Sequence, residues 1–112
     1  MAKYISIAYT LTASAGSEGD VTLYRVEDAR VLRLTDVRVN FPSGQAFQLQ
    51  LSLYRGVQQV APYQGVYAGN GGVMADSVDV VLQSGERLIL HYKNTDTTNP
   101  QSAFILVGGE LE

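Results

Sequence analysis

Alternation of apolar and polar residues with a period of two constrains this chain more than any other feature. Residues 3–12 and 46–54 alternate strictly, as side chains do on a strand with one buried face. No stretch keeps the 3.6-residue period of a helix over ten residues. The residues predicted to face inward are Ile5, Ile7, Tyr9 and Leu11 in the first segment and Phe47, Leu49, Leu51 and Leu53 in the second. The chain is therefore predicted to be all-β.

Turn residues divide the rest of the chain into further short strands. Strands are predicted at residues 21–26, 31–41, 57–61, 77–82, 87–94 and 102–107. The glycine-rich residues 63–75 are predicted to form one long surface loop. About seven or eight short strands joined by turns indicate an antiparallel two-sheet β-sandwich of the jelly-roll kind, with residues 1–112 as a single domain.

Two segments indicate how the strands are arranged. In residues 31–41 the inward parity changes between Leu34 and Val37. A β-bulge, or a strand that bends from one sheet into the other, produces such a switch and favours two sheets. Residues 102–107 are a nearly continuous apolar run, which is typical of a central strand covered on both faces.

Composition limits the class of protein. The chain has 112 residues, of which 46% are hydrophobic and 17% charged, so it can bury one core, and no apolar run approaches the roughly 20 residues of a membrane span. The net charge is −3 and the eight Lys and Arg residues are scattered, so neither nucleic acid nor membrane is an expected partner. The N-terminus lacks the apolar segment of a secretory signal, so we expect a soluble protein made in the cytoplasm. Because there is no cysteine, the fold is expected to rest on packing alone.

Residues able to support catalysis or metal binding are few. His91 is the only histidine and lies in a predicted strand without a nucleophile motif, so we expect it to be an exposed or hydrogen-bonded strand residue. One histidine without cysteine provides too few ligands for zinc, and the acidic residues match no calcium-loop spacing. The glycine run at residues 69–72 lacks the Lys and the Ser or Thr of a phosphate-binding loop. We therefore expect no enzymatic activity, cofactor or metal. The acids weighed are Glu18, Asp20, Glu27, Asp28, Asp76, Asp79 and Asp96.

The residues predicted to face outward on the clearest strand are polar but uncharged. This candidate interface consists of Gln48, Gln50, Ser52 and Tyr54. Retained tyrosine and glutamine with few charges are typical of subunit contacts, so a homo-oligomer is expected. Tyr63 and Tyr67, in the predicted long loop, are candidate loop contacts. The alternative is a carbohydrate-binding module in which Tyr54, Tyr63 and Tyr67 stack on a glycan.

Two stretches carry a resemblance to a known class of protein. Residues 31–53 and 78–111 combine short strands, a Ser-Gly-Glu-Arg hairpin, an Asn/Thr/Asp-rich loop and a final strand that ends in glycines. In these features the chain resembles the small jelly-roll proteins of virions, such as capsid decoration proteins and fibre-head domains. The resemblance implies a phage or archaeal-virus protein without an active site, which self-associates, most often as a trimer, and attaches to a capsid, a tail or a neighbouring subunit.

Overall fold

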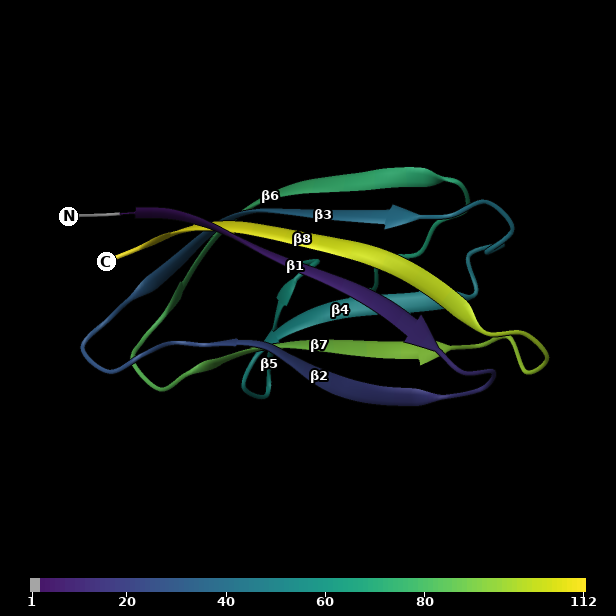
Figure 1. Cartoon of the computed structure of the whole chain (residues 1–112), viewed down its shortest axis with the longest axis horizontal. Coiled ribbons are helices and arrows are strands. Elements are labelled where there is room, and N and C mark those ends of the chain that lie inside the picture. The colour runs from purple at the N-terminus through teal and green to yellow at the C-terminus, as the bar shows by residue number, and fades with distance from the viewer. Residues whose placement is uncertain (1–2) are drawn as a thin grey trace.

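Eight β-strands form two four-stranded antiparallel sheets in the computed structural model, which describes residues 3–112 (Figure 1). The first sheet has the strand order β1-β8-β3-β6, and the second has the order β2-β7-β4-β5. The chain changes sheet at every connection except the β4–β5 hairpin, which is the winding of a jelly roll. The expected Ser-Gly-Glu-Arg hairpin is wrong, because the strands on its two sides, β6 and β7, lie in different sheets. The predicted all-β, two-sheet sandwich of jelly-roll type is confirmed. The strands are β1 (Lys3–Ala13), β2 (Glu18–Arg25), β3 (Leu32–Phe41), β4 (Leu49–Arg55), β5 (Gln58–Ala61), β6 (Gly72–Leu82), β7 (Arg87–Asn94) and β8 (Gln101–Leu111).

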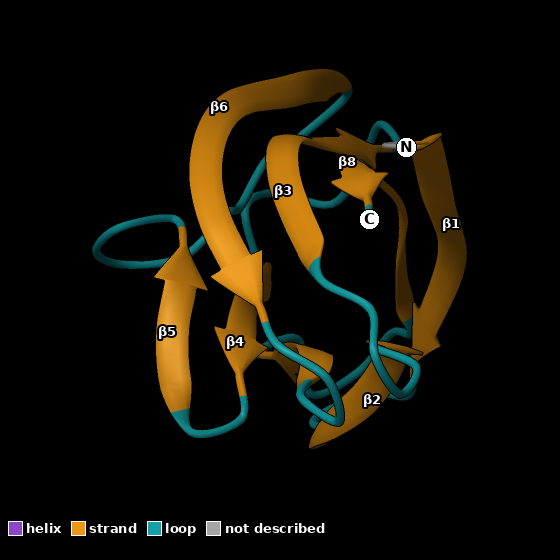
Figure 2. Ribbon diagram, turned by 90° about the vertical axis from the view of Figure 1, so that its left-hand side faces the viewer, coloured by secondary structure: helices purple, strands orange, loops and turns teal. Residues whose placement is uncertain are grey.

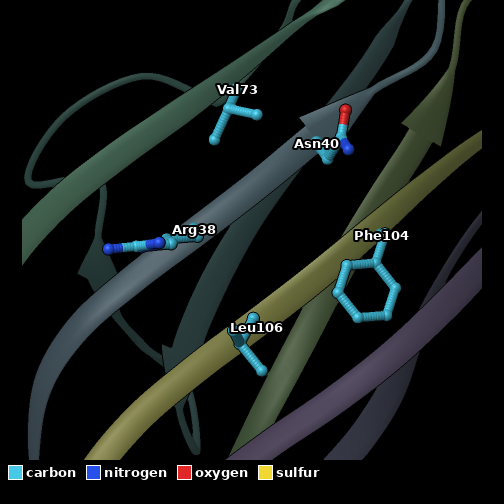
Figure 3. Close-up of a pocket in the computed structure, with 5 residues that line it drawn as sticks. All are labelled: Arg38, Asn40, Val73, Phe104 and Leu106. Atoms are coloured by element: carbon cyan, nitrogen blue, oxygen red, sulfur yellow. The ribbon is translucent and has the colours of Figure 1, made fainter.

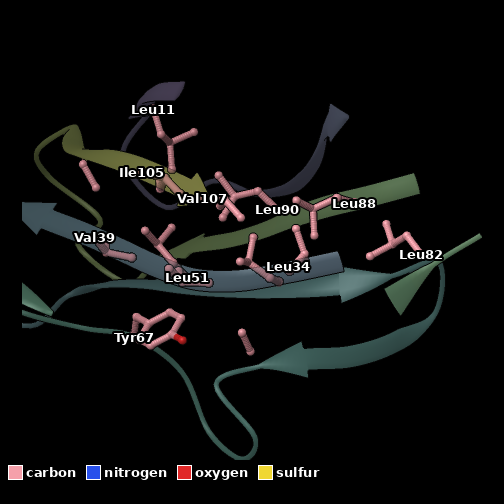
Figure 4. Close-up of a cluster of buried hydrophobic side chains, with 14 of the residues drawn as sticks. Leu11, Leu34, Val39, Leu51, Tyr67, Leu82, Leu88, Leu90, Ile105 and Val107 are labelled. Atoms are coloured by element: carbon pink, nitrogen blue, oxygen red, sulfur yellow. The ribbon is translucent and has the colours of Figure 1, made fainter. Parts of the chain in front are cut away.

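The hydrophobic core lies between the two sheets, which Figure 2 shows as separate layers. Alternate side chains of each strand point the same way, so the inward residues of the two sheets meet across the sandwich, as the side chains in Figure 4 do. Leu49, Leu51 and Leu53 are buried as predicted. Complete burial of one such side chain contributes about 1.5–3 kcal/mol, and these contacts replace the disulfides that the chain lacks.

The change of parity in residues 31–41 is a β-bulge in β3. The register of β3 shifts between Leu34 and Asp36 against both of its neighbours, β6 and β8. Against β8, Thr35 is the extra residue, because Leu34 and Asp36 pair with the adjacent residues Gly109 and Gly108. Against β6 the extra residue lies on β6 instead, between Ser77 and Val80. The Thr35 hydroxyl donates to Oδ1 of Asp36 at 3.0 Å or to the carbonyl oxygen of Gly108 at 3.3 Å. Because of this extra residue, Leu34 and Val37 both point into the core.

The expectation that residues 63–75 form one long loop is wrong at its end. Strand β6 begins at Gly72 and pairs with β3 from that residue onward. Within the remaining loop, Tyr67 is also held to the sheet, because it exchanges two backbone hydrogen bonds with Leu51, of 2.7 and 2.9 Å. Glycines lower strand propensity, but here the pairing partners supplied by β3 and β4 outweigh that local preference.

The expectation that Phe47 points into the core is also wrong. Ala46 and Phe47 have φ angles of 51° and 60°, which a strand cannot contain, and β4 begins only at Leu49. The side chain of Phe47 is 63% exposed. The apolar–polar alternation continues into a turn at this point, and periodicity does not distinguish a strand residue from a turn residue of the same parity.

Strand β8 is central in the first sheet, between β1 and β3, but it is covered on one face only. Its inward residues Ala103, Ile105 and Val107 are buried. On its outer face Phe104 is 42% exposed and Leu106 is half-buried, so the predicted cover on both faces is wrong for the isolated chain. Within residues 3–112, no helix is long and apolar enough to cross a membrane.

Candidate interaction surfaces

The predicted interface residues lie on the outer face of the second sheet, on β4 and just before it. Gln48, Gln50 and Tyr54 are half-buried, and the Tyr54 hydroxyl donates to Oε1 of Gln59 at 3.3 Å. Ser52 is only 2% exposed, so the expectation that it contacts a partner is corrected: its side chain is buried between neighbouring strands, opposite His91. The other three residues remain predicted contacts.

His91 occupies the centre of the same outer face, on β7. Its Nδ1 lies 2.7 Å from Oδ1 of Asp20, and its Nε2 lies 3.0 Å from Oε2 of Glu18. The ring also meets the edge of Tyr54, with 6.1 Å between ring centroids and an angle of 72° between the planes. The imidazole donates to both carboxylates only when both nitrogens carry protons. Both ring nitrogens lie within hydrogen-bond distance of carboxylates on β2, so His91 is part of a hydrogen-bonded network on the surface.

The three tyrosines of the carbohydrate alternative do not share one platform. Tyr63 is 90% exposed and lines an open groove of about 270 Å³ between β5 and β6, together with Arg55, Gln58 and Asp79. Tyr67 is buried, and its hydroxyl donates to Oδ2 of Asp76 at 3.0 Å. Burial, reinforced by this hydrogen bond, raises the pKa of Tyr67 well above its ordinary value. The assignment of Tyr67 as an exposed loop contact is therefore corrected.

The carboxylate of Asp96 is hydrogen-bonded by residues that follow it closely in the chain. Its carboxylate accepts hydrogen bonds from the backbone N–H of Thr98 and Asn99 and from the side chains of Thr98 and Gln101. These bonds, led by the one from the Thr98 backbone, lower the pKa of Asp96 to about 2. In the part of the chain that the structure describes, no group of three His, Asp or Glu side chains is placed to hold a metal ion.

The outer face of the first sheet carries an apolar hollow that sequence reasoning missed. Figure 3 shows its five lining residues, which come from β3, β6 and β8 and enclose about 170 Å³. In the sheet register Phe104 lies beside Asn40, which lies beside Val73, and Leu106 lies beside Arg38 in the next row. The apolar run of residues 102–107 was the sequence signal for this surface, since it predicted a second cover for β8. We call this surface, formed by Arg38, Asn40, Val73, Phe104 and Leu106, the β8 hollow.

Comparison with known proteins finds solved structures with a similar fold. No protein-family model and no curated protein matches the chain. Among solved structures, a chain of Sulfolobus Turreted Icosahedral Virus superposes with a TM-score of 0.60 at 15% identity, over 97% of this chain and 29% of that one. A chain from the capsid of Helicobacter pylori bacteriophage KHP30 gives 0.58 at 12% identity, over 98% of this chain and 93% of that one. A chain from the capsid asymmetric unit of cyanophage Pam1 gives 0.52 at 12% identity, over 97% and 84%.

This chain thus spans less than a third of the Sulfolobus virus chain but most of each phage chain. At such low identities the likeness concerns the fold alone. At that level it agrees with the resemblance noted in the sequence, because these structural neighbours are jelly-roll chains of virus particles.

Proposed function

We propose that this chain is a structural component of a virus particle, a capsid decoration or other surface protein of a phage or archaeal virus. The observation that carries the proposal is the superposition of almost the whole chain on jelly-roll chains from virus particles, two of them little longer than this chain. The chain works without enzymatic activity or cofactor, by contact between surfaces. It is made in the cytoplasm and then joins the particle.

The surface of the sandwich supports this role. The outer face of the first sheet exposes Val73 and Phe104 around the β8 hollow, and apolar side chains that lie together on a surface favour contact with another molecule. The outer face of the second sheet adds the uncharged side chains of Gln48, Gln50 and Tyr54. The protein self-associates as a symmetric homo-oligomer, with a trimer as the favoured number, and binds neighbouring capsid subunits through faces left free in that oligomer.

Sedimentation of virus particles tests this proposal directly. Particles released from the organism that carries the gene are banded on a density gradient, and an antibody against the purified chain is used to locate it. We expect the chain to peak with the particles and to label their surface in electron micrographs. A chain that stays with cytoplasmic proteins while particles band elsewhere contradicts the proposal.

A carbohydrate-binding role is the second candidate, and the groove at Tyr63 favours it. An exposed aromatic ring beside amide and charged side chains is a common composition of sugar sites. A glycan array probed with the wild-type chain and with Tyr63→Ala tests it. Binding that disappears in the variant supports the role, and an array without signal for the wild-type chain excludes it.

A further inference from the structure

The loop between β3 and β4, residues 42–48, presents Phe47 to solvent. Phe47 and Ala46 both have positive φ angles, a rare conformation for residues with side chains. The backbone N–H of Phe47 donates to the carbonyl oxygen of Gly69 at 3.2 Å, which turns the peptide toward the protein and the ring away from it. A strained backbone that exposes a large aromatic side chain is costly, so it points to a use for the ring.

This loop is fastened to the rest of the sandwich on both sides. Oδ1 of Asn70 accepts hydrogen bonds from the backbone N–H groups of Gly44 and Gln45, at 2.8 and 3.1 Å. The carbonyl oxygen of Gln48 accepts one from the Thr95 backbone at 2.9 Å and one from the Thr95 hydroxyl at 2.8 Å. The backbone on both sides of Phe47 is therefore held in place before any partner arrives, and a preordered loop loses little conformational entropy when it binds.

The β8 hollow has the size and chemistry to receive such a ring. The hollow is open to solvent, and its volume of about 170 Å³ is enough for one aromatic ring, since an enclosed cavity of about 150 Å³ binds benzene in another protein. Val73, Phe104 and Leu106 supply apolar contact. Arg38 has no ion-pair partner among residues 3–112, and a guanidinium beside an aromatic face is attracted by the negative charge of that face.

The two surfaces are also compatible in charge. Residues 42–48 contain no charged side chain, so nothing on the loop repels Arg38. Phe47 does not line the hollow of its own chain. A contact between these two different surfaces is either reciprocal within a two-fold dimer or joins copies head to tail, and repeated head-to-tail contacts build a closed ring if the rotation between copies closes.

We propose that Phe47 of one copy of this chain inserts into the β8 hollow of the next copy, and that this contact, repeated, closes the copies into a ring. The inference rests on the proposed self-association and identifies the surfaces that produce it. Each chain then uses one knob and one hollow, which agrees with an odd-numbered oligomer such as a trimer. Insertion of Phe47 also gives β8 the second cover that its apolar sequence predicts.

Analytical ultracentrifugation of purified variants tests the contact. We expect Phe47→Ser and Leu106→Glu each to raise the dissociation constant of the oligomer by about thirtyfold or more, as loss of a central interface residue does. The matched control is Val57→Ser, because Val57 is 99% exposed in the turn between β4 and β5, at the other end of the sandwich. Val73→Glu serves as a second hollow variant if Leu106→Glu fails to fold.

A mixture of Phe47→Ser and Leu106→Glu chains tests whether knob and hollow meet, and the number of copies in the wild-type oligomer distinguishes a ring from a two-fold dimer. One chain keeps a hollow and the other keeps a knob, so the mixture is expected to form a pair that cannot grow further. Because the natural chain has no cysteine, Ala46→Cys and Ala75→Cys chains add the only thiols in a second mixture, and both keep Phe47 and the five lining residues. Ala46 precedes Phe47, and Ala75 lies beside Arg38 in the sheet, so the mixture is expected to give a disulfide-linked heterodimer that Val57→Cys does not form with either.

Three results overturn the contact: a wild-type chain that is monomeric at all concentrations, an oligomer that survives Phe47→Ser, or mixtures that yield neither pair nor cross-link. A monomeric wild-type chain also removes the proposed self-association, whereas an oligomer that survives Phe47→Ser removes only this contact. The gradient experiment tests the place of the chain in the virus particle separately from both.

Discussion

Replacing Gly109 with alanine is expected to destabilise the fold, while the same replacement at the adjacent Gly108 is expected to do much less. Gly109 lies on β8 between Ile5 of β1 and Leu34 of β3. A Cβ atom at this position would be 2.7 Å from the carbonyl oxygen of Arg33, about 0.7 Å short of an ordinary contact of 3.4 Å. That oxygen belongs to the backbone of the neighbouring strand, so the two strands must separate to make room.

The neighbouring glycine provides the control. A Cβ atom at Gly108 would overlap the hydroxyl of Tyr4 and a carboxylate oxygen of Asp36, which hydrogen-bond to each other at 3.0 Å. Both are ends of side chains on the outer face, and Tyr4 can swing into solvent. Neither glycine has a positive φ, so alanine fits the backbone conformation at both positions.

The expected magnitude follows from two opposing effects. Overpacking against a rigid neighbour costs about 1–3 kcal/mol, whereas replacing glycine by alanine stabilises by about 0.4–1 kcal/mol through the unfolded chain. Gly109→Ala should therefore lose about 1–2 kcal/mol, and each kcal/mol lowers the melting temperature of a domain near this size by about 4–8 °C. Urea denaturation followed by circular dichroism measures the loss. If Gly108→Ala is destabilised as much as Gly109→Ala, the argument from backbone contact is wrong.

Three further predictions follow from the buried residues. The pKa of Asp96 is lowered from 3.8 to about 2, so the stability that Asp96 contributes is present above about pH 4 and is lost as the pH falls through 2. When the pH is lowered from 5 to 2, the urea midpoint should fall for the wild-type chain and should change less for Asp96→Asn. The pKa of Tyr67 is raised, so folding stability is lost as the pH rises above 10. Tyr67→Phe should cost about 1 kcal/mol of stability at pH 7, because it leaves Asp76 without its hydrogen-bond donor. The same variant should lose less stability above pH 10, as measured by circular dichroism. Ile105→Ala should cost about 2–5 kcal/mol in urea denaturation, whereas Phe104→Ala, one residue away on the exposed face, should cost far less, and equal losses would contradict the one-sided cover of β8.

Local pattern was sufficient for the class of fold and for much of the core. Alternation predicted the inward positions of β4 from Leu49 to Leu53. The change of parity near Thr35 predicted either a bulge or a bend between sheets, and the structure has the bulge, with β3 staying in the first sheet. These inferences succeed because side chains alternate strictly across a strand, and a one-residue insertion is visible as a break in that alternation.

The candidate site was harder to predict, because it depends on contacts between residues far apart in the chain. Phe47 has the parity of a core residue, but its hydrogen bond to Gly69 and the anchoring of its loop by Asn70 turn it to solvent. Tyr67 lies in a glycine-rich segment typical of a surface loop, but pairing with Leu51 buries it. Local propensity carries no information about such partners.

The amino-acid pattern alone was enough to establish an antiparallel sandwich without disulfides, since periodicity and composition act within a few residues. The β8 hollow and the Phe47 knob required the three-dimensional arrangement, because the strand order β1-β8-β3-β6 places Arg38, Val73 and Leu106 on one face although they are distant in sequence. Which surfaces meet is a property of strand order and register, and these are set by the packing of the whole sandwich.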